Sequence, residues 1–296
     1  CTAQYLRSYG TIERQTFFSS PFVTESSLNM QISNCQVFLI EIKQTKPLAP
    51  YRSHIRTSDW TTKAIVKLET DRGLVGWGEH NQNFLPDINI EKQNTSAREF
   101  IIGWDPYDVE RYHQENPFEP RLRCGIEMAM WDLIGKDNGQ PLYKLLGGKV
   151  RERVELAACM GIQTYERAGE MARWYVEQGY TALKTKAGAE AQEDFDMVRG
   201  VRDAVGDKLK LRIDPNRAYS TEEAAELAIK LEPYGLEYFE QPIMAEPLSD
   251  AKWLRDQTTT PIALNESVEG PDSVMRILEA DAAEFILPDT HTAGGV

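Results

Sequence analysis

The 296-residue sequence predicts an α/β fold in which a (β/α) barrel of the TIM type follows an N-terminal α+β capping domain. The first observation is a strict alternation of strand-like and helix-like segments from Val154 onward. The second is a set of acidic or amide residues that end three successive strand-like runs, at Asp214, Glu240 and the pair Asn265 and Glu266. Their separations of 26 and 25 residues are about the length of one strand-and-helix unit of a parallel barrel. Because the chain ends soon after a sixth run, we expect a barrel that is incomplete after its sixth strand.

The segment before the barrel predicts a capping domain over residues 30–150, preceded by a polar N-terminal segment over residues 1–29 that has no hydrophobic pattern. Alternating apolar and polar residues over 35–45 and 61–71 predict two β-strands. A DRG turn then leads into a third run over 74–80, so the three runs together indicate an antiparallel meander.

A buried helix is expected next, because Ile126, Met130, Leu133 and Ile134 recur at helical spacing and Gly139 is typical of a helix end. These apolar positions are interpreted as core.

The barrel domain is expected over residues 151–296. Its strand-like runs lie at 154–161, 180–186, 209–215, 236–242, 261–266 and 284–289. Helices are predicted between them at 165–178, 192–205, 221–231, 249–256 and 271–279. Catalytic side chains of such a barrel lie at the C-terminal ends of its strands.

Composition limits the partners of the chain. A net charge of −13 argues against a surface for nucleic acid or anionic membranes, and no apolar run approaches the roughly 20 residues of a membrane-spanning helix. The four cysteines show neither metal-ligand nor disulfide spacing, which favours free thiols in a cytoplasmic protein. We therefore expect a small-molecule carboxylate as the partner, and a homo-oligomeric protein.

Clustered oxygen ligands at the strand ends favour Mg²⁺, which prefers carboxylates and water. Lys184 and Lys186 end an earlier strand-like run, and side chains two apart on a strand share a face. A metal bound to a substrate carboxylate stabilises the dianion that forms when the neighbouring carbon loses its proton. A lysine is a suitable base when another cation beside it lowers its pKa from about 10.4. The pattern indicates proton abstraction next to a carboxylate.

Seven segments together carry a family resemblance. They are GWGE at 76–79, MAMWDLIGK with GQPLYKLLGGKVR at 128–151, ALKTKAG at 182–188, RIDPNRAY at 212–219, YFEQP at 238–242, ALNES at 263–267 and LPDTHTAGG at 287–295. The chain resembles the enolase superfamily, in its mandelate racemase and muconate lactonizing branches, from about residue 30 to its end.

The resemblance implies roles for the strand-end residues. Lys186 corresponds to the base that removes the α-proton, and Lys184 to the lysine that tunes it and contacts the substrate carboxylate. Asp214 and Glu240 correspond to the first two Mg²⁺ ligands. The third ligand stays open between Asn265, since glucarate dehydratases use Asn there, and Glu266, the mandelate-type position.

The resemblance also implies a role for Asp289 on the sixth strand. Muconate-lactonizing and dipeptide-epimerase relatives carry a lysine there, whereas mandelate racemase and the acid-sugar dehydratases carry an Asp that pairs with a His. The residues between the first two strands, 46–60, form a loop that closes over the barrel mouth in this superfamily. Arg52, His54 and Arg56 are therefore candidates for substrate recognition, and their polarity favours a hydroxylated substrate.

The resulting hypothesis is a lyase of carbohydrate acid catabolism that dehydrates an acid sugar to a 2-keto-3-deoxy acid with Mg²⁺. The alternative within the same chemistry is a racemase or epimerase of a 2-hydroxy acid. The alternative of another class is a non-catalytic metal-binding homologue or an inactive fragment.

Overall fold

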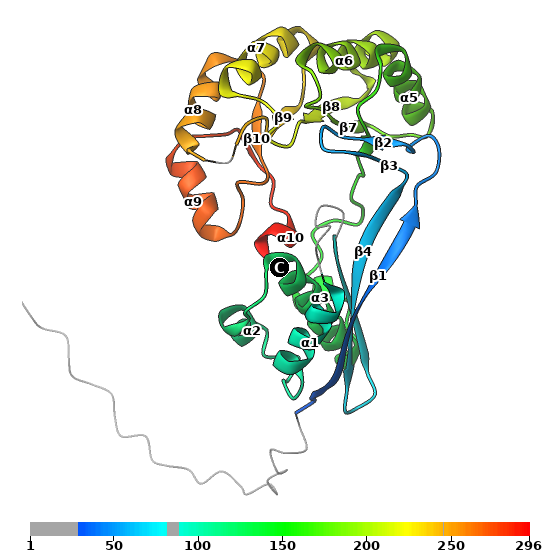
Figure 1. Ribbon diagram of the computed structural model, residues 1–296, viewed down its shortest axis with the longest axis vertical. Coiled ribbons are helices and arrows are strands. Elements are labelled where there is room, and N and C mark those ends of the chain that lie inside the picture. The colour runs from blue at the N-terminus through cyan, green and yellow to red at the C-terminus, as the bar shows by residue number, and fades with distance from the viewer. Residues whose placement is uncertain (1–28, 82–88, 245) are drawn as a thin grey trace, which may run out of the picture.

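The computed structural model describes residues 29–81, 89–244 and 246–296. An arc of parallel strands with helices on its outer side stands beside a long antiparallel sheet flanked by helices (Figure 1). The expected polar segment over residues 1–29 lies, apart from Asn29, outside the described residues.

The antiparallel sheet has the strand order β1-β4-β5, as the meander prediction requires. Its strands are β1 (Ile32–Lys43), β4 (Trp60–Thr70) and β5 (Val75–Asn81). Four helices follow it: α1 (Ile90–Ile101), α2 (Val109–Glu115), α3 (Pro120–Asp137) and α4 (Leu142–Leu145). The segment expected to be a loop contains a short hairpin, made of β2 (Tyr51–Arg52) and β3 (Thr57–Ser58). Two-residue strands are too short to produce a readable alternation pattern.

Helix α3 packs against β5 at close range because two glycines of β5 carry no side chain. A Cβ atom on Gly76 would lie 2.2 Å from the carbonyl oxygen of Ala129, and one on Gly78 would lie 1.9 Å from that of Gly125. The apolar face of α3 is buried as predicted. This face, together with β1 and β4, forms one of the two hydrophobic cores.

The second core lies between the parallel strands and their helices. The sheet order β6-β7-β8-β9-β10-β11 confirms the predicted parallel α/β arrangement. Its strands are β6 (Ala158–Met160), β7 (Ala182–Lys186), β8 (Lys210–Asp214), β9 (Tyr238–Glu240), β10 (Ile262–Leu264) and β11 (Phe285–Ile286). The helices are α5 (Tyr165–Glu177), α6 (Ala191–Val205), α7 (Thr221–Leu231), α8 (Leu248–Gln257) and α9 (Pro271–Glu279). A last turn of helix, α10 (Thr290–Ala293), was not predicted from the sequence.

Strand register brings the candidate residues to one rim. In β7, Leu183 and Thr185 are buried against the helices, so Lys184 and Lys186 lie on the opposite face. The parallel pairing aligns Lys186 with Asp214 on β8, and the following strands are in step with them. Within the described ranges, no helix is both long enough and apolar enough to cross a membrane.

Candidate active site

Two lysines and two carboxylates from three neighbouring strands form the centre of the site. The Lys184 ammonium lies 2.6 Å from Oε1 of Glu240 and 3.0 Å from Oδ2 of Asp214. The Lys186 ammonium lies 2.6 Å from the same Oδ2 of Asp214. Asp214 and Glu240 are almost completely buried, at 1% and 2% exposure. The expected strand-end cluster is therefore present, with the lysines and acids in direct contact.

The charges in this cluster control one another. Burial alone would raise the pKa of Asp214, but Lys186 and Lys184 outweigh it, so the pKa of Asp214 is lowered. Burial, together with the charge of Asp214, raises the pKa of Glu240. Burial alone would lower the pKa of Lys184, but Asp214 and Glu240 outweigh it and raise the pKa. The arrangement keeps Lys184 cationic, which suits a residue that binds an anion.

The two candidates for the third metal ligand differ in their surroundings. The Asn265 side-chain amide donates to the carbonyl of Leu287, 2.8 Å away. Oε1 of Glu266 accepts from the side chain of Asn216 at 2.7 Å. Oε2 of Glu266 is buried and has no hydrogen-bond partner among the described residues, and the same is true of Oε2 of Glu240. Both residues therefore stay candidates.

Asn216 is a site residue that the sequence analysis missed. Its side-chain oxygen accepts from the Lys186 ammonium at 2.6 Å, while its amide donates to Glu266. Its φ of +48° is left-handed, a conformation that Asn adopts more readily than most residues. Its backbone N–H donates to Oδ1 of Asp214 at 3.0 Å, which closes a tight turn. The Asp-Pro-Asn sequence after a strand was the signal that could have indicated this turn.

Gln241 is a second missed residue, and it is fully buried next to Glu240. Its side-chain oxygen accepts from the backbone N–H of Asn265 at 3.0 Å, and from the N–H and hydroxyl of Ser267, both at 3.1 Å. One side chain directly after β9 therefore fixes the path of the chain after β10, where the third ligand is expected.

Asp289 lies at the N-terminus of α10, where its Oδ1 accepts from the backbone N–H of His291 at 2.8 Å. His291 therefore sits in the helical turn of α10.

The three recognition candidates of the β2–β3 segment have different surroundings. The Arg52 guanidinium pairs with Glu193 of α6 at 3.0 Å, and both side chains are half-exposed. Burial, followed by the charge of Lys186, lowers the pKa of His54, so His54 lies within electrostatic reach of Lys186. The Arg56 carbonyl accepts from the N–H of Ser53 at 2.8 Å inside the hairpin turn.

A cavity of about 330 Å³ opens over the rim. It is lined by Ile55, Asn81, Arg121, Lys184, Lys186, Asp214, Asn216, Arg217, Asn265, Glu266, Asp289, His291 and Thr292. An adjoining cavity of about 450 Å³ shares Lys184, Asn265 and Asp289 with it and adds Glu240 and Tyr238. All seven candidate catalytic and metal-binding residues therefore line this pair of cavities, at the scale of a small-ligand site.

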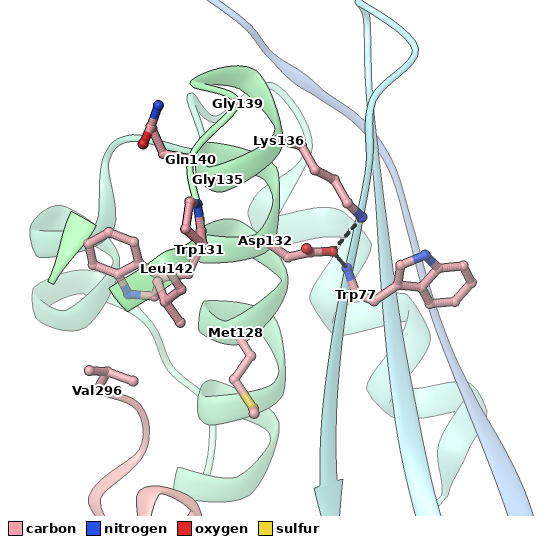
Figure 2. A pocket seen from close by; sticks show the side chains of 11 residues that line it. Trp77, Met128, Trp131, Asp132, Gly135, Lys136, Gly139, Gln140, Leu142 and Val296 are labelled. Atoms are coloured by element: carbon pink, nitrogen blue, oxygen red, sulfur yellow. Dashed lines mark hydrogen bonds and ion pairs between the residues drawn. The ribbon is translucent and has the colours of Figure 1, made fainter. Parts of the chain in front are cut away.

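A larger cavity of about 550 Å³ lies on the capping domain and contains none of these residues (Figure 2). Trp77, Met128, Trp131 and Leu142 give it a mainly apolar lining. Its acid, Asp132, is already bound to Lys136 at 2.6 Å and to the N–H of Trp77 at 2.8 Å. This composition favours packing over proton chemistry.

Magnesium fits the oxygen donors of the rim. Within the described part of the chain, no three His, Cys, Asp or Glu side chains converge as a metal cluster. A donor set of two carboxylates and the Asn265 amide contains only two such side chains, so it is compatible with this observation. The buried, unpartnered oxygens of Glu240 and Glu266 are hard donors of the kind that Mg²⁺ binds.

Comparison with known families covers both parts of the chain. Residues 36–147 match the mandelate racemase / muconate lactonizing enzyme N-terminal domain. Residues 166–296 match the enolase C-terminal domain-like family.

Individual relatives include epimerases and dehydratases. An L-Ala-D/L-Glu epimerase from Clostridium acetobutylicum is 30% identical over 83% of this chain and 72% of the relative. An arabinonate dehydratase from Saccharolobus solfataricus is 29% identical over 78% of this chain and 66% of the relative. The crystal structure of a dipeptide epimerase from Enterococcus faecalis, complexed with Mg and the dipeptide L-Leu-L-Tyr, superposes with a TM-score of 0.81 at 28% identity. The superposed region covers 90% of this chain and 76% of the Enterococcus faecalis chain.

The paired domain matches, the shared fold and the relatives of both reaction classes agree with the rim geometry. The chain belongs to the mandelate racemase/muconate lactonizing enzyme family of the enolase superfamily, a family of lyases, racemases and epimerases.

Proposed function

We propose that this protein removes the proton α to a carboxylate with the help of Mg²⁺, and that its reaction is the dehydration of an acid sugar to a 2-keto-3-deoxy acid. The observation that carries the proposal is the rim itself. Lys184 and Lys186 contact Asp214 and Glu240 at the ends of three adjacent strands, and these residues line one pair of adjoining cavities.

In this proposal Asp214, Glu240 and either Asn265 or Glu266 hold the metal. When bound, Mg²⁺ supplies positive charge that stabilises the substrate dianion. The Lys184 ammonium donates a hydrogen bond to the substrate carboxylate. Lys186 accepts the α-proton at Nζ, and Asp214 and Asn216, each 2.6 Å away, orient that nitrogen.

Dehydration also needs an acid for the departing hydroxyl. Asp289 lines both cavities, and we assign to it the positioning of that acid. An Asp at this strand end, where dipeptide-epimerase relatives carry a lysine, favours a dehydratase or a 2-hydroxy acid racemase over a dipeptide epimerase. The arabinonate dehydratase among the relatives supports dehydration.

Racemisation or epimerisation of a 2-hydroxy acid is the second candidate, and it uses the same proton abstraction without a leaving group. The epimerases from Clostridium acetobutylicum and Enterococcus faecalis support this candidate as strongly as the dehydratase supports the first.

The test is to incubate the protein with Mg²⁺ in D₂O against a panel of acid sugars, 2-hydroxy acids and dipeptides. We expect 2-keto acid from an acid sugar. Deuterium incorporation with inversion at the α-carbon, and no keto acid, would select the epimerase. If no compound exchanges its α-proton, the proposed proton abstraction is wrong.

A further inference from the structure

The four residues of α10 lie between the barrel and the capping domain. Asp289, at the N-terminus of α10, lines both active-site cavities, and His291 lines the 330 Å³ one. α10 also lies beside α3, a helix of the capping domain (Figure 1). A single helical turn is too short to be stable by itself. The place of Asp289 at the cavities therefore depends on what holds α10 at its two ends.

The barrel holds the segment before α10. The side-chain amide of Asn265 donates to the Leu287 carbonyl at 2.8 Å, and the Leu287 N–H donates to the Leu264 carbonyl at 2.9 Å. Oδ1 of Asp289 then accepts from the N–H of His291 at 2.8 Å. The direction of the Asp289 carboxylate is therefore tied to the first turn of α10.

The capping domain holds the other end of α10 through Arg123 of α3. Nη2 of Arg123 donates to the Ala293 carbonyl at 2.6 Å, and Nε donates to the Gly294 carbonyl at 3.2 Å. The last carbonyls of a helix have no partner within the helix and carry partial negative charge. A guanidinium is a cation with several donors in one plane, so it satisfies two of these carbonyls together.

Glu127, one turn further along α3, holds the chain just after α10. The backbone N–H of Val296 donates to its carboxylate, 3.1 Å from Oε1 and 3.0 Å from Oε2. Glu127 is fully buried, and its Oε1 also lies 3.2 Å from Nε2 of His113 and 3.0 Å from Nε1 of Trp131. A buried carboxylate is tolerated only when it is hydrogen-bonded, and here one donor is the backbone that follows α10.

Two glycines after α10 allow the chain to run this close to α3. Gly294 and Gly295 have φ values of +83° and +142°, in the region that favours glycine. A Cβ on Gly294 would lie 1.9 Å from Nε of Arg123, and one on Gly295 would lie 2.6 Å from Cδ of Glu127. A side chain at either glycine would therefore have to displace the charged group that holds the segment.

We propose that Arg123 and Glu127 are positioning residues, which clamp the end of α10 to the capping domain and thereby hold Asp289 and His291 at the active-site cavity. This inference rests on the proposed function, in which Asp289 positions the acid for the departing hydroxyl. It goes further because it assigns the support of that acid to α3, a helix outside the barrel.

Proton abstraction is supported independently of this clamp. Lys186 is held by Asp214 and Asn216, each 2.6 Å away, and both belong to the barrel. Loss of the clamp should therefore slow the departure of the hydroxyl and leave removal of the α-proton intact. A role in general stability would instead affect both steps.

Amide hydrogen exchange, followed residue by residue by NMR, tests the clamp itself. Arg123→Gln should speed exchange of the His291 and Val296 amides by about tenfold or more, because charge-assisted hydrogen bonds are lost. Arg123→Lys keeps the cation and should keep part of the protection. Arg111→Gln is the matched control, because Arg111 pairs with Glu115 on the exposed surface of α2, and it should change neither amide. Unchanged exchange in Arg123→Gln overturns the clamp.

Glu127→Gln is the second variant, and it decides the question if Arg123→Gln does not fold. It keeps the shape of the side chain and removes its charge, so the Val296 amide should again exchange about tenfold faster. The amides of Leu183 and Ile213, in β7 and β8, should keep the rate of the parent protein. Full protection of the Val296 amide in this variant excludes Glu127 from the clamp.

The role in the reaction is tested with an acid sugar that the parent protein dehydrates. In D₂O with Mg²⁺, Arg123→Gln should form 2-keto acid at least about tenfold more slowly and exchange the α-proton at the parent rate. Arg123→Lys should recover part of the keto-acid rate. An equal loss of both rates, or keto-acid formation at the parent rate, overturns the positioning role. A parent protein that forms no 2-keto acid from any acid sugar refutes the proposed function, and amide exchange then decides the clamp by itself.

Discussion

At the residue scale, the two lysines of β7 are distinguished by their partners. Lys184 contacts both buried carboxylates, and this environment raises its pKa. Lys186 contacts Asp214 and the neutral amide oxygen of Asn216. The sequence gives the two residues equivalent places on one face of a strand. The structure adds an asymmetry between them, because Lys184 contacts two carboxylates and Lys186 contacts one carboxylate and one amide.

The role of Lys186 leads to the first prediction. Lys186→Ala should lower the rate of α-proton exchange in D₂O by about 10²- to 10⁴-fold, because the general base is lost. Binding of Mg²⁺, measured by calorimetry, should persist. Lys230→Ala, at an exposed position on α7, is the control and should exchange at the normal rate. Undiminished exchange in Lys186→Ala would exclude this lysine as the base.

A second prediction separates the two candidates for the third metal ligand. Asn265→Ala should weaken Mg²⁺ binding more than Glu266→Gln, because Glu266 is already bound to Asn216 through one oxygen. Calorimetric titration of both variants provides the ranking. The opposite ranking would identify Glu266 as the ligand.

Strand-end residues were predictable from the sequence because a parallel barrel brings equivalent positions of successive strands to one rim. Asn216 and Gln241 were not predictable in this way. Their roles depend on hydrogen bonds to residues that are distant in sequence, such as Glu266 and Ser267, and these contacts exist only after the strands have assembled.

At the scale of elements, Asp194 joins three neighbouring segments beneath the rim. From the first turn of α6 its carboxylate accepts from the Gly188 N–H at 2.5 Å, just after β7, and from the Tyr219 hydroxyl, just after β8. Burial is the main cause that raises the pKa of Asp194 from 3.8 to about 6, and these two hydrogen bonds oppose it. Asp194 therefore binds α6 to two loops: the loop after β7, the strand that carries the lysines, and the loop after β8, the strand that carries Asp214.

This raised pKa gives a prediction for stability. Between about pH 4 and pH 6 the unfolded chain loses the Asp194 proton before the folded chain does, so this group makes the fold less stable as pH rises. Asp194→Asn keeps an acceptor for both donors and removes the titration. The free energy of unfolding of the variant, relative to the parent, should therefore improve by roughly 2 kcal/mol from pH 4 to pH 7.

Urea denaturation at both pH values measures this difference. Asp207→Asn, at an exposed position in the turn after α6, is the control and should show no comparable change. A pH-independent difference for Asp194→Asn would show that its carboxyl group does not titrate in this window.

At the scale of the whole molecule, Mg²⁺ binding should stabilise the fold, since the proposed ligands come from separate strands and converge only in the native state. At a Mg²⁺ concentration 100 times its dissociation constant, the gain should be about 2.7 kcal/mol. A thermal melt with Mg²⁺ should show a raised Tm that EDTA reverses. Asp214→Ala and Glu240→Ala should abolish the increase, while the exposed Asp207→Asn should retain it. An increase that survives both rim substitutions would place the metal elsewhere.

The two walls of the 330 Å³ cavity belong to different parts of the chain, and this has an evolutionary consequence. The reacting wall comes from strand ends that share a core with their helices, so a change there alters chemistry and folding together. Ile55, Asn81 and Arg121 stand on the capping domain, which has a core of its own. Selection can therefore change the substrate specificity of the protein without changing the residues of the reacting wall. A combinatorial library confined to those three codons is the economical place to search for new substrates.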